Sequence, residues 1–82
     1  MFYVYVLQSR IDRTYYIGHT QNVTVRLGQH NRGKYQYTKG HRPWALVYQE
    51  EVKSRSEAVK RERCLKTGIG RLEIKKILSR SS

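Results

Sequence analysis

The chain has 82 residues, a length that fits one compact domain with a modest core and leaves no room for a second. Seventeen Lys and Arg against six Asp and Glu give a net charge of +11, spread along the sequence, which favours a polyanionic partner. The sequence shows no membrane span, amphipathic basic helix or signal peptide, and its single cysteine, Cys64, excludes an intrachain disulfide and a paired zinc site. We therefore expect a single domain over residues 1–82, cytoplasmic and stabilised by packing alone.

The first part of the sequence predicts a β-hairpin followed by a helix. Residues alternate between two faces from Phe2 to Gln8, which is typical of a half-buried strand, and a second β-rich run ends near His19. A short polar segment joins the two runs, so a hairpin is the simplest connection. The period then changes to that of a helix starting at Val23, with Asn22 as its N-cap and Gly33 as its stop.

The second part predicts a loop, a strand and two helices. Residues 34–42 are basic and aromatic without periodicity, which indicates a loop, and Trp44 to Glu51 reads as a third strand. Ser54 and Glu57 match a capping box, so a helix should span about 55–67; Gly68 and Gly70 should break it before a last helix at 71–79. The sequence therefore predicts an α+β fold, a small and mostly antiparallel three-stranded sheet flanked by helices, in the order β-β-α-β-α-α.

Glu62 is the acidic residue whose position needs an explanation. It lies four residues after Ala58 and three before Leu65, within an apolar stripe that Val59 and Ile69 should complete. A carboxylate on the core side of a helix costs several kcal/mol unless it is paired or binds a metal. The helical pattern leaves two explanations open, a salt bridge to a basic residue and a metal ligand.

Two pairs of residues share a face on their predicted elements. Arg26 and His30 lie four residues apart on the first helix, where a solvated charge and a polar residue at the helix edge are the ordinary interpretations. Tyr5 and Tyr16 project together if the hairpin register places them opposite each other, with Gly18 leaving room for a neighbouring backbone. Such aromatic pairs often serve only packing.

Taken in order, these residues resemble the GIY-YIG nuclease superfamily. The match consists of Tyr3-Val4-Tyr5, Tyr16-Ile17-Gly18, Arg26, His30 and the helix around Glu62, and it covers almost the whole chain. More narrowly, the chain is similar to the small stand-alone bacterial members and to the nuclease domain of the excision-repair subunit that incises DNA beside damaged bases.

The resemblance implies a role for each matched residue. Tyr5 and Tyr16 would position or deprotonate the attacking water, with His30 as a helper to Tyr5. Arg26 would stabilise charge on the scissile phosphate, and Glu62 would bind one divalent metal ion, Mg²⁺ or Mn²⁺. These are the parts that phosphodiester hydrolysis needs, a nucleophile, a cation at the phosphate oxygens and a metal.

The chain departs from the family pattern at three points. The first triplet has Tyr3 and Val4 where the family name has Gly and Ile, His19 stands where several relatives carry lysine, and the late asparagine of many members has no counterpart. The missing asparagine bears on catalytic efficiency more than on the fold. Without an appended recognition domain, sequence-specific cutting is not expected, and a partner protein could supply specificity.

We therefore predict a metal-dependent DNA endonuclease with little sequence specificity, selective at most for DNA structure during repair or processing. The alternative is a non-catalytic module that binds DNA or RNA, in which Glu62 only pairs with a base such as Lys66 or Arg26. In either case we expect branched or single-stranded nucleic acid to contact basic and aromatic side chains near the site, namely His19, Lys34, Tyr35, Tyr37, Lys39, His41, Arg42 and Lys66.

Overall fold

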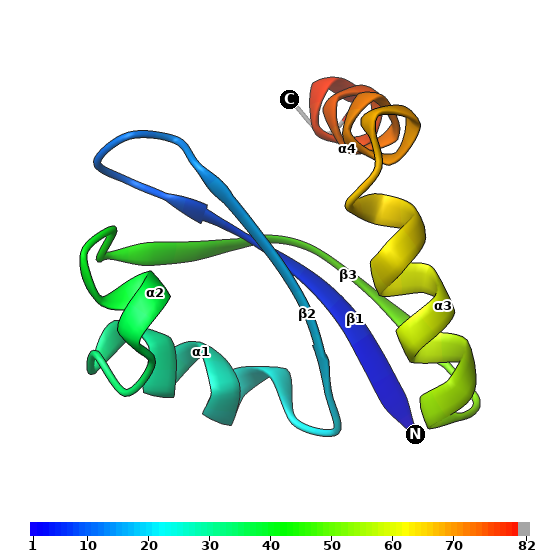
Figure 1. The fold of residues 1–82 in the computed structure, drawn as a ribbon, viewed down its shortest axis with the longest axis horizontal. Helices are drawn as coiled ribbons and strands as arrows, with labels where there is room; N and C mark the ends of the chain where they lie inside the picture. The colour runs from blue at the N-terminus through cyan, green and yellow to red at the C-terminus, as the bar shows by residue number, and fades with distance from the viewer. Residues whose placement is uncertain (81–82) are drawn as a thin grey trace.

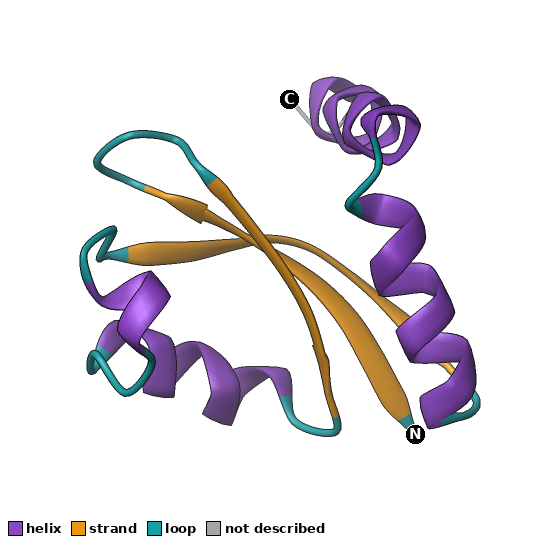
Figure 2. Ribbon diagram, in the orientation of Figure 1, coloured by secondary structure: helices purple, strands orange, loops and turns teal. Residues whose placement is uncertain are grey.

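The computed structural model describes residues 1–80 and shows a three-stranded antiparallel sheet with helices on both faces (Figures 1 and 2). In chain order the elements are β1 (Phe2–Ser9), β2 (Tyr15–Thr20), α1 (Val23–Asn31), α2 (Gln36–Lys39), β3 (Trp44–Val52), α3 (Arg55–Leu65) and α4 (Gly68–Arg80). The predicted α+β class and antiparallel sheet are confirmed. No helix among the described residues is long and apolar enough to cross a membrane.

The central strand β1 explains why the core has two halves. Val4 and Val6 point to the face covered by α3 and α4, whereas Tyr5 and Leu7 point to the face covered by α1 (Figure 1). Because both faces carry helices, all four side chains are buried, although strand alternation alone predicts burial on one face. The strand order β2-β1-β3 leaves β2 at an edge of the sheet.

The α1 face contains the first difference from the sequence prediction. The Asn22 side chain accepts a hydrogen bond from the Val25 amide at 3.1 Å and starts α1 as expected. The segment 34–42, predicted as a loop, forms the short helix α2, which buries Thr38 against the core. The Thr38 carbonyl accepts a hydrogen bond from the Trp44 indole at 2.9 Å. A four-residue helix is too short to show a period in the sequence, so tertiary contacts decide its structure.

On the other face, α3 starts at the predicted capping residue, where the Ser54 hydroxyl accepts a hydrogen bond from the Glu57 amide at 3.2 Å. The predicted break between two helices is present, but it lies at residues 66–67 and not at the glycines, since α3 ends at Leu65 and Gly68 and Gly70 lie in the first turn of α4. A Cβ atom at Gly70 would lie 2.1 Å from the Cys64 carbonyl oxygen. Glycine at this position therefore allows α4 to pack closely on the end of α3.

Arg61 fixes the orientation of α3. Its Nε donates to Glu50 on β3 at 2.8 Å, and its guanidinium also bonds to Glu73 on α4. Together with the burial of Ala58 and Leu65 against β1 and β2, these bonds hold α3 in one rotational setting. That setting turns the next residue, Glu62, towards His19 on β2.

Candidate active site

The edge strand β2 brings together side chains from both faces of the sheet. Ile17 packs in the core under α3, so His19 points to the same side, whereas Tyr16 and Gly18 point towards α1. The residues matched to the family lie on β1, β2, α1 and α3, the elements that surround this strand. An edge strand has one open side, where groups from both faces can meet a ligand.

Tyr5 and Tyr16 do share a face, but not in the predicted register. Gly18 is the residue opposite Tyr5, and Leu7 is opposite Tyr16, so the two phenols are diagonal neighbours with ring centroids 6.3 Å apart. A Cβ atom at Gly18 would lie 2.7 Å from the Tyr5 hydroxyl oxygen and 2.9 Å from Cζ. Gly18 therefore makes room for the Tyr5 ring, not for a backbone as the sequence suggested.

Tyr5 belongs to a buried chain of hydrogen bonds. Its hydroxyl lies 3.2 Å from His30 Nε2, and His30 Nδ1 lies 2.9 Å from the Thr38 hydroxyl. The Thr38 hydroxyl has a carbonyl acceptor of its own, so the consistent assignment is that His30 Nδ1–H donates to Thr38 and that Nε2 accepts from Tyr5. Burial lowers the pKa of His30, and the charge of Arg26 lowers it further. This series of hydrogen bonds requires His30 to be neutral.

The two phenols differ in accessibility. Tyr5 is 1% exposed, and burial, followed by the proximity of Tyr16, raises its pKa. Tyr16 is half-buried and its hydroxyl has no hydrogen-bond partner within residues 1–80, yet no polar side-chain atom there is both buried and unpaired. The Tyr16 hydroxyl therefore reaches solvent. Burial raises the pKa of Tyr16, while the positive charges of Lys66 and Arg26 act in the opposite direction.

Glu62 forms a hydrogen bond with His19 and an ion pair with Lys66 at the same edge of the sheet. One carboxylate oxygen lies 2.6 Å from His19 Nδ1 and the other accepts from Lys66 Nζ at 2.8 Å. The Glu62 side chain is 20% exposed. Its burial alone would raise the pKa of the carboxyl, but the hydrogen bonds from Lys66 and His19 outweigh that effect and hold the pKa below its usual value. Glu62 is therefore an ionised carboxylate at neutral pH.

The apolar stripe predicted around Glu62 is only partly formed. Ala58 and Leu65 are buried and Val59 is half-buried, but Ile69 is 81% exposed because it lies on α4, whose direction differs from that of α3 (Figure 1). Glu62 consequently lies at the rim of the core. From the sequence we expected a base such as Lys66 or Arg26 as its partner. In the structure Lys66 is one partner, and the second is His19.

The carboxylate of Glu62 suits a metal ion whose other ligands are mainly water and the phosphates of a bound substrate. Within the described residues, no three His, Cys, Asp or Glu side chains lie close enough together to hold a metal. Mg²⁺ typically keeps several waters and uses one or two carboxylates together with substrate phosphates. One ionised, partly accessible carboxylate beside basic groups fits that pattern.

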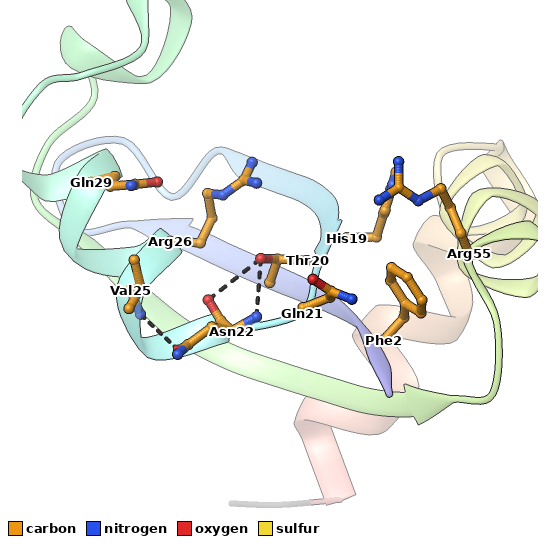
Figure 3. A pocket seen from close by; sticks show the side chains of 9 residues that line it. All are labelled: Phe2, His19, Thr20, Gln21, Asn22, Val25, Arg26, Gln29 and Arg55. Atoms are coloured by element: carbon orange, nitrogen blue, oxygen red, sulfur yellow. Dashed lines mark hydrogen bonds between the residues drawn. The ribbon is translucent and has the colours of Figure 1, made fainter.

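Arg26 extends from α1 towards the same strand. Its guanidinium lies over the Tyr35 ring, 5.6 Å from the centroid, and forms no salt bridge within residues 1–80. It lines the pocket between α1 and α3 together with His19 (Figure 3). An unpaired cation at this place can meet a phosphate without first breaking an ion pair.

The side chains predicted to contact nucleic acid divide into two groups. Tyr37, which is 59% exposed, lies with its ring 6.2 Å from Tyr16 and, like Lys66 and His19, is near the matched residues. Tyr35 is also near them, since it contacts Arg26 and His30, whereas within the described residues His41 and Arg42 have only local contacts. Lys34 lies over the half-buried Tyr35 ring, which packs on His30; His41 pairs with Asp12, and Arg42 Nε donates to the Lys39 carbonyl.

Sequence reasoning missed three residues of the site region. Thr38 orients His30, and nothing in the sequence marks it because α2 is not recognisable there. Arg55 lines the pocket with Arg26, and Arg71 lines a second pocket with Tyr16, Tyr37 and Lys66. One basic residue among seventeen carries no signal in sequence, so only the fold distinguishes these two.

The whole fold, and most of the sequence, is similar to that of known proteins. The model of the GIY-YIG catalytic domain family matches residues 1–71. A UPF0213 protein of Staphylococcus haemolyticus is 44% identical over 79 residues, covering 95% of each chain, and one of Syntrophus aciditrophicus is 48% identical over 66 residues, covering 78% of this chain and 75% of the relative. The solution structure of the UPF0213 protein BH0048 from Bacillus halodurans superposes with a TM-score of 0.57 at 31% identity, covering 94% of this chain and 85% of that one.

Proposed function

The chain belongs to the GIY-YIG family, a family of nucleases, and from this premise we propose that it is an endonuclease that hydrolyses DNA phosphodiester bonds with one divalent metal ion. The observation that carries the proposal is that Glu62 lies between two pockets at the edge of β2. It is bonded to His19, which lines one pocket with Arg26, and to Lys66, which lines a second pocket with Tyr16.

Hydrolysis requires water to attack phosphorus while one ester P–O bond breaks and the water loses a proton. We assign Tyr16 to direct contact with the attacking water, because its hydroxyl is the accessible one and has no hydrogen-bond partner among the described residues. Tyr5 and His30 are positioning residues. Their hydrogen bond holds the Tyr5 ring over Gly18, beside the Tyr16 ring, and so limits where the water can bind.

We assign Arg26 and Glu62 to stabilising the negative charge of the scissile phosphate, Arg26 directly and Glu62 through the metal. Arg26 would donate hydrogen bonds to the non-bridging oxygens of the scissile phosphate, where charge accumulates in the transition state. Glu62 would hold the metal, Mg²⁺ or Mn²⁺, which supplies further positive charge at the phosphate when bound. Lys66 and His19, which pair with Glu62 in the free protein, would then be released to contact the DNA backbone.

A second candidate function is a DNA- or RNA-binding module without catalysis. The specific observation in its favour is that the ion pair with Lys66 and the hydrogen bond with His19 already satisfy Glu62, so this carboxylate needs no metal for the protein to be stable. The two functions share the basic surface and differ in the need for a metal. A measurement of DNA or RNA binding therefore does not distinguish an endonuclease from a binding module.

The test is incubation of the purified protein with end-labelled single-stranded, duplex and branched DNA, and with matching RNA, in Mg²⁺, in Mn²⁺ and in EDTA. The proposal expects cleavage of DNA that EDTA abolishes, with a preference among DNA structures but not among sequences. A role in DNA repair or processing would appear as preference for branched or damaged duplexes. Tight binding without cleavage of any substrate in either metal would favour the binding module.

A further inference from the structure

A pocket of about 360 Å³ opens between α1 and the start of α3, beside the candidate active site (Figure 3). Its basic side chains come from three elements: Arg26 on α1, His19 on β2 and Arg55 on α3. His19 connects this pocket to the candidate metal ligand, because its Nδ1 lies 2.6 Å from Glu62. A ligand in the pocket would therefore be adjacent to the reacting phosphate.

The lining presents hydrogen-bond donors and no carboxylate. Neither Arg26 nor Arg55 forms a salt bridge in the described part of the chain. The side-chain NH₂ groups of Gln21, Asn22 and Gln29 also have no acceptor within residues 1–80. Five unused donor groups around one pocket without an acidic residue match an anionic ligand that is rich in acceptors, such as a phosphodiester.

The pocket also has an apolar side that restrains one of its arginines. The Arg55 guanidinium lies 5.4 Å from the centroid of the Phe2 ring, in a cation–π contact, and Val25, across the pocket on α1, is 50% exposed (Figure 3). A guanidinium held on an aromatic ring loses less conformational freedom when it binds a phosphate. Phe2 and Val25 offer apolar surface to the sugar or base attached to that phosphate.

We infer that this pocket, the α1–α3 pocket, binds the nucleotide next to the scissile phosphate in a single strand of nucleic acid, with Arg55 contacting the phosphate of that nucleotide. The inference rests on the proposed function for the place of the scissile phosphate. The binding itself needs only the pocket. Arg55 is thus a substrate-binding residue outside the group matched to the family.

Binding is measured without divalent metal, in EDTA, so that catalysis does not enter the result. The probe is 5′-phosphorylated thymidine dinucleotide, with inorganic phosphate in a parallel titration, and the readout is the NMR shift of the side-chain amides of Gln21, Asn22 and Gln29. The dinucleotide should shift these signals more strongly than phosphate does. Arg55→Gln should weaken dinucleotide binding about tenfold, the loss expected for one charged hydrogen bond at an exposed site.

Arg63→Gln is the matched control, because Arg63 is exposed on the same helix, carries the same charge and does not line the pocket. For a longer single-stranded oligonucleotide, Arg55→Gln should also reduce the slope of log K against log salt by about 0.7, the value for one lost phosphate contact. Equal losses in both variants, or amide shifts elsewhere on the protein, would overturn the inference. If binding follows the expectation but no DNA is ever cleaved, the proposed function fails while the nucleotide site stands.

Discussion

Gly18 offers a sharp test of the packing behind the two phenols. In the Gly18→Ala variant the added methyl group would lie 2.7 Å from the Tyr5 hydroxyl oxygen and 2.9 Å from Cζ, so the ring has to move. Tyr5 is 1% exposed and its hydroxyl is bonded to His30, so any movement strains the core and breaks that bond. Overpacking costs about 1–3 kcal/mol and a lost hydrogen bond about 1 kcal/mol, a total near 2–4 kcal/mol.

The assay is urea and thermal unfolding followed by circular dichroism. A loss of 2–4 kcal/mol in a domain of this size lowers Tm by roughly 8–30 °C. Gly28→Ala is the control, because a Cβ atom there meets nothing within 4 Å and α1 should gain about 0.5–1 kcal/mol from alanine. Gly18→Ala should also cost about 1 kcal/mol less in a Tyr5→Phe background, which lacks the oxygen that the methyl group meets first. A Gly18→Ala protein as stable as wild type would refute the packing argument.

Three further results are expected. Tyr16→Phe should lower the cleavage rate at least about a hundredfold and change stability by less than about 1 kcal/mol. Tyr5→Phe should lower stability by about 1–3 kcal/mol, because the buried His30 nitrogen loses its donor, and should reduce the cleavage rate less than Tyr16→Phe does. Equal rates in Tyr16→Phe and wild type would remove Tyr16 from the mechanism. Because the pKa of His30 is lowered in the folded protein, the unfolded chain takes up a proton at higher pH than the folded chain does. The free energy of unfolding should therefore fall as pH drops below about 6.5, and this fall should be smaller in His30→Gln. Identical pH profiles for the two proteins would contradict a buried neutral His30. With a net charge of +11, log K for DNA should fall linearly with log salt, and an affinity independent of ionic strength would contradict phosphate contacts.

The sequence predicted the elements whose signals are local. Strand alternation located β1, and the capping residues Asn22 and Ser54 located the starts of α1 and α3. Where packing in the core decides, the prediction failed. The short helix α2 has no signal of its own in the sequence, and in the structure its Thr38 is buried and bonded to His30 and Trp44.

The site was predictable as a set of residues but not as a geometry. Glu62 stood out because a carboxylate near an apolar stripe requires a partner. The sequence pointed to Lys66, four residues on, but the second partner, His19, lies 43 positions away in the chain and no pattern connects the two. The register of the hairpin, which places Gly18 and not Tyr16 opposite Tyr5, depends on turn geometry that the polar segment does not specify. Arg55 gained its significance only when the fold placed it across a pocket from Arg26.

The most direct test of the central claim is DNA cleavage by Glu62→Gln in Mg²⁺, with binding and unfolding measured on the same protein. Glutamine keeps the size of the side chain and removes the charge. The contacts that weaken, an ion pair with Lys66 and a hydrogen bond with His19, involve side chains that are 52% and 30% exposed, so stability should change by no more than about 1 kcal/mol. Glu51→Gln is the control, since Glu51 is exposed on β3 and the charge change is identical. We predict a folded Glu62→Gln protein that binds DNA at least as tightly as wild type and does not cut it, beside a Glu51→Gln protein that cuts normally. A folded Glu62→Gln protein that cleaves at the wild-type rate would contradict the assignment of Glu62 as the metal ligand.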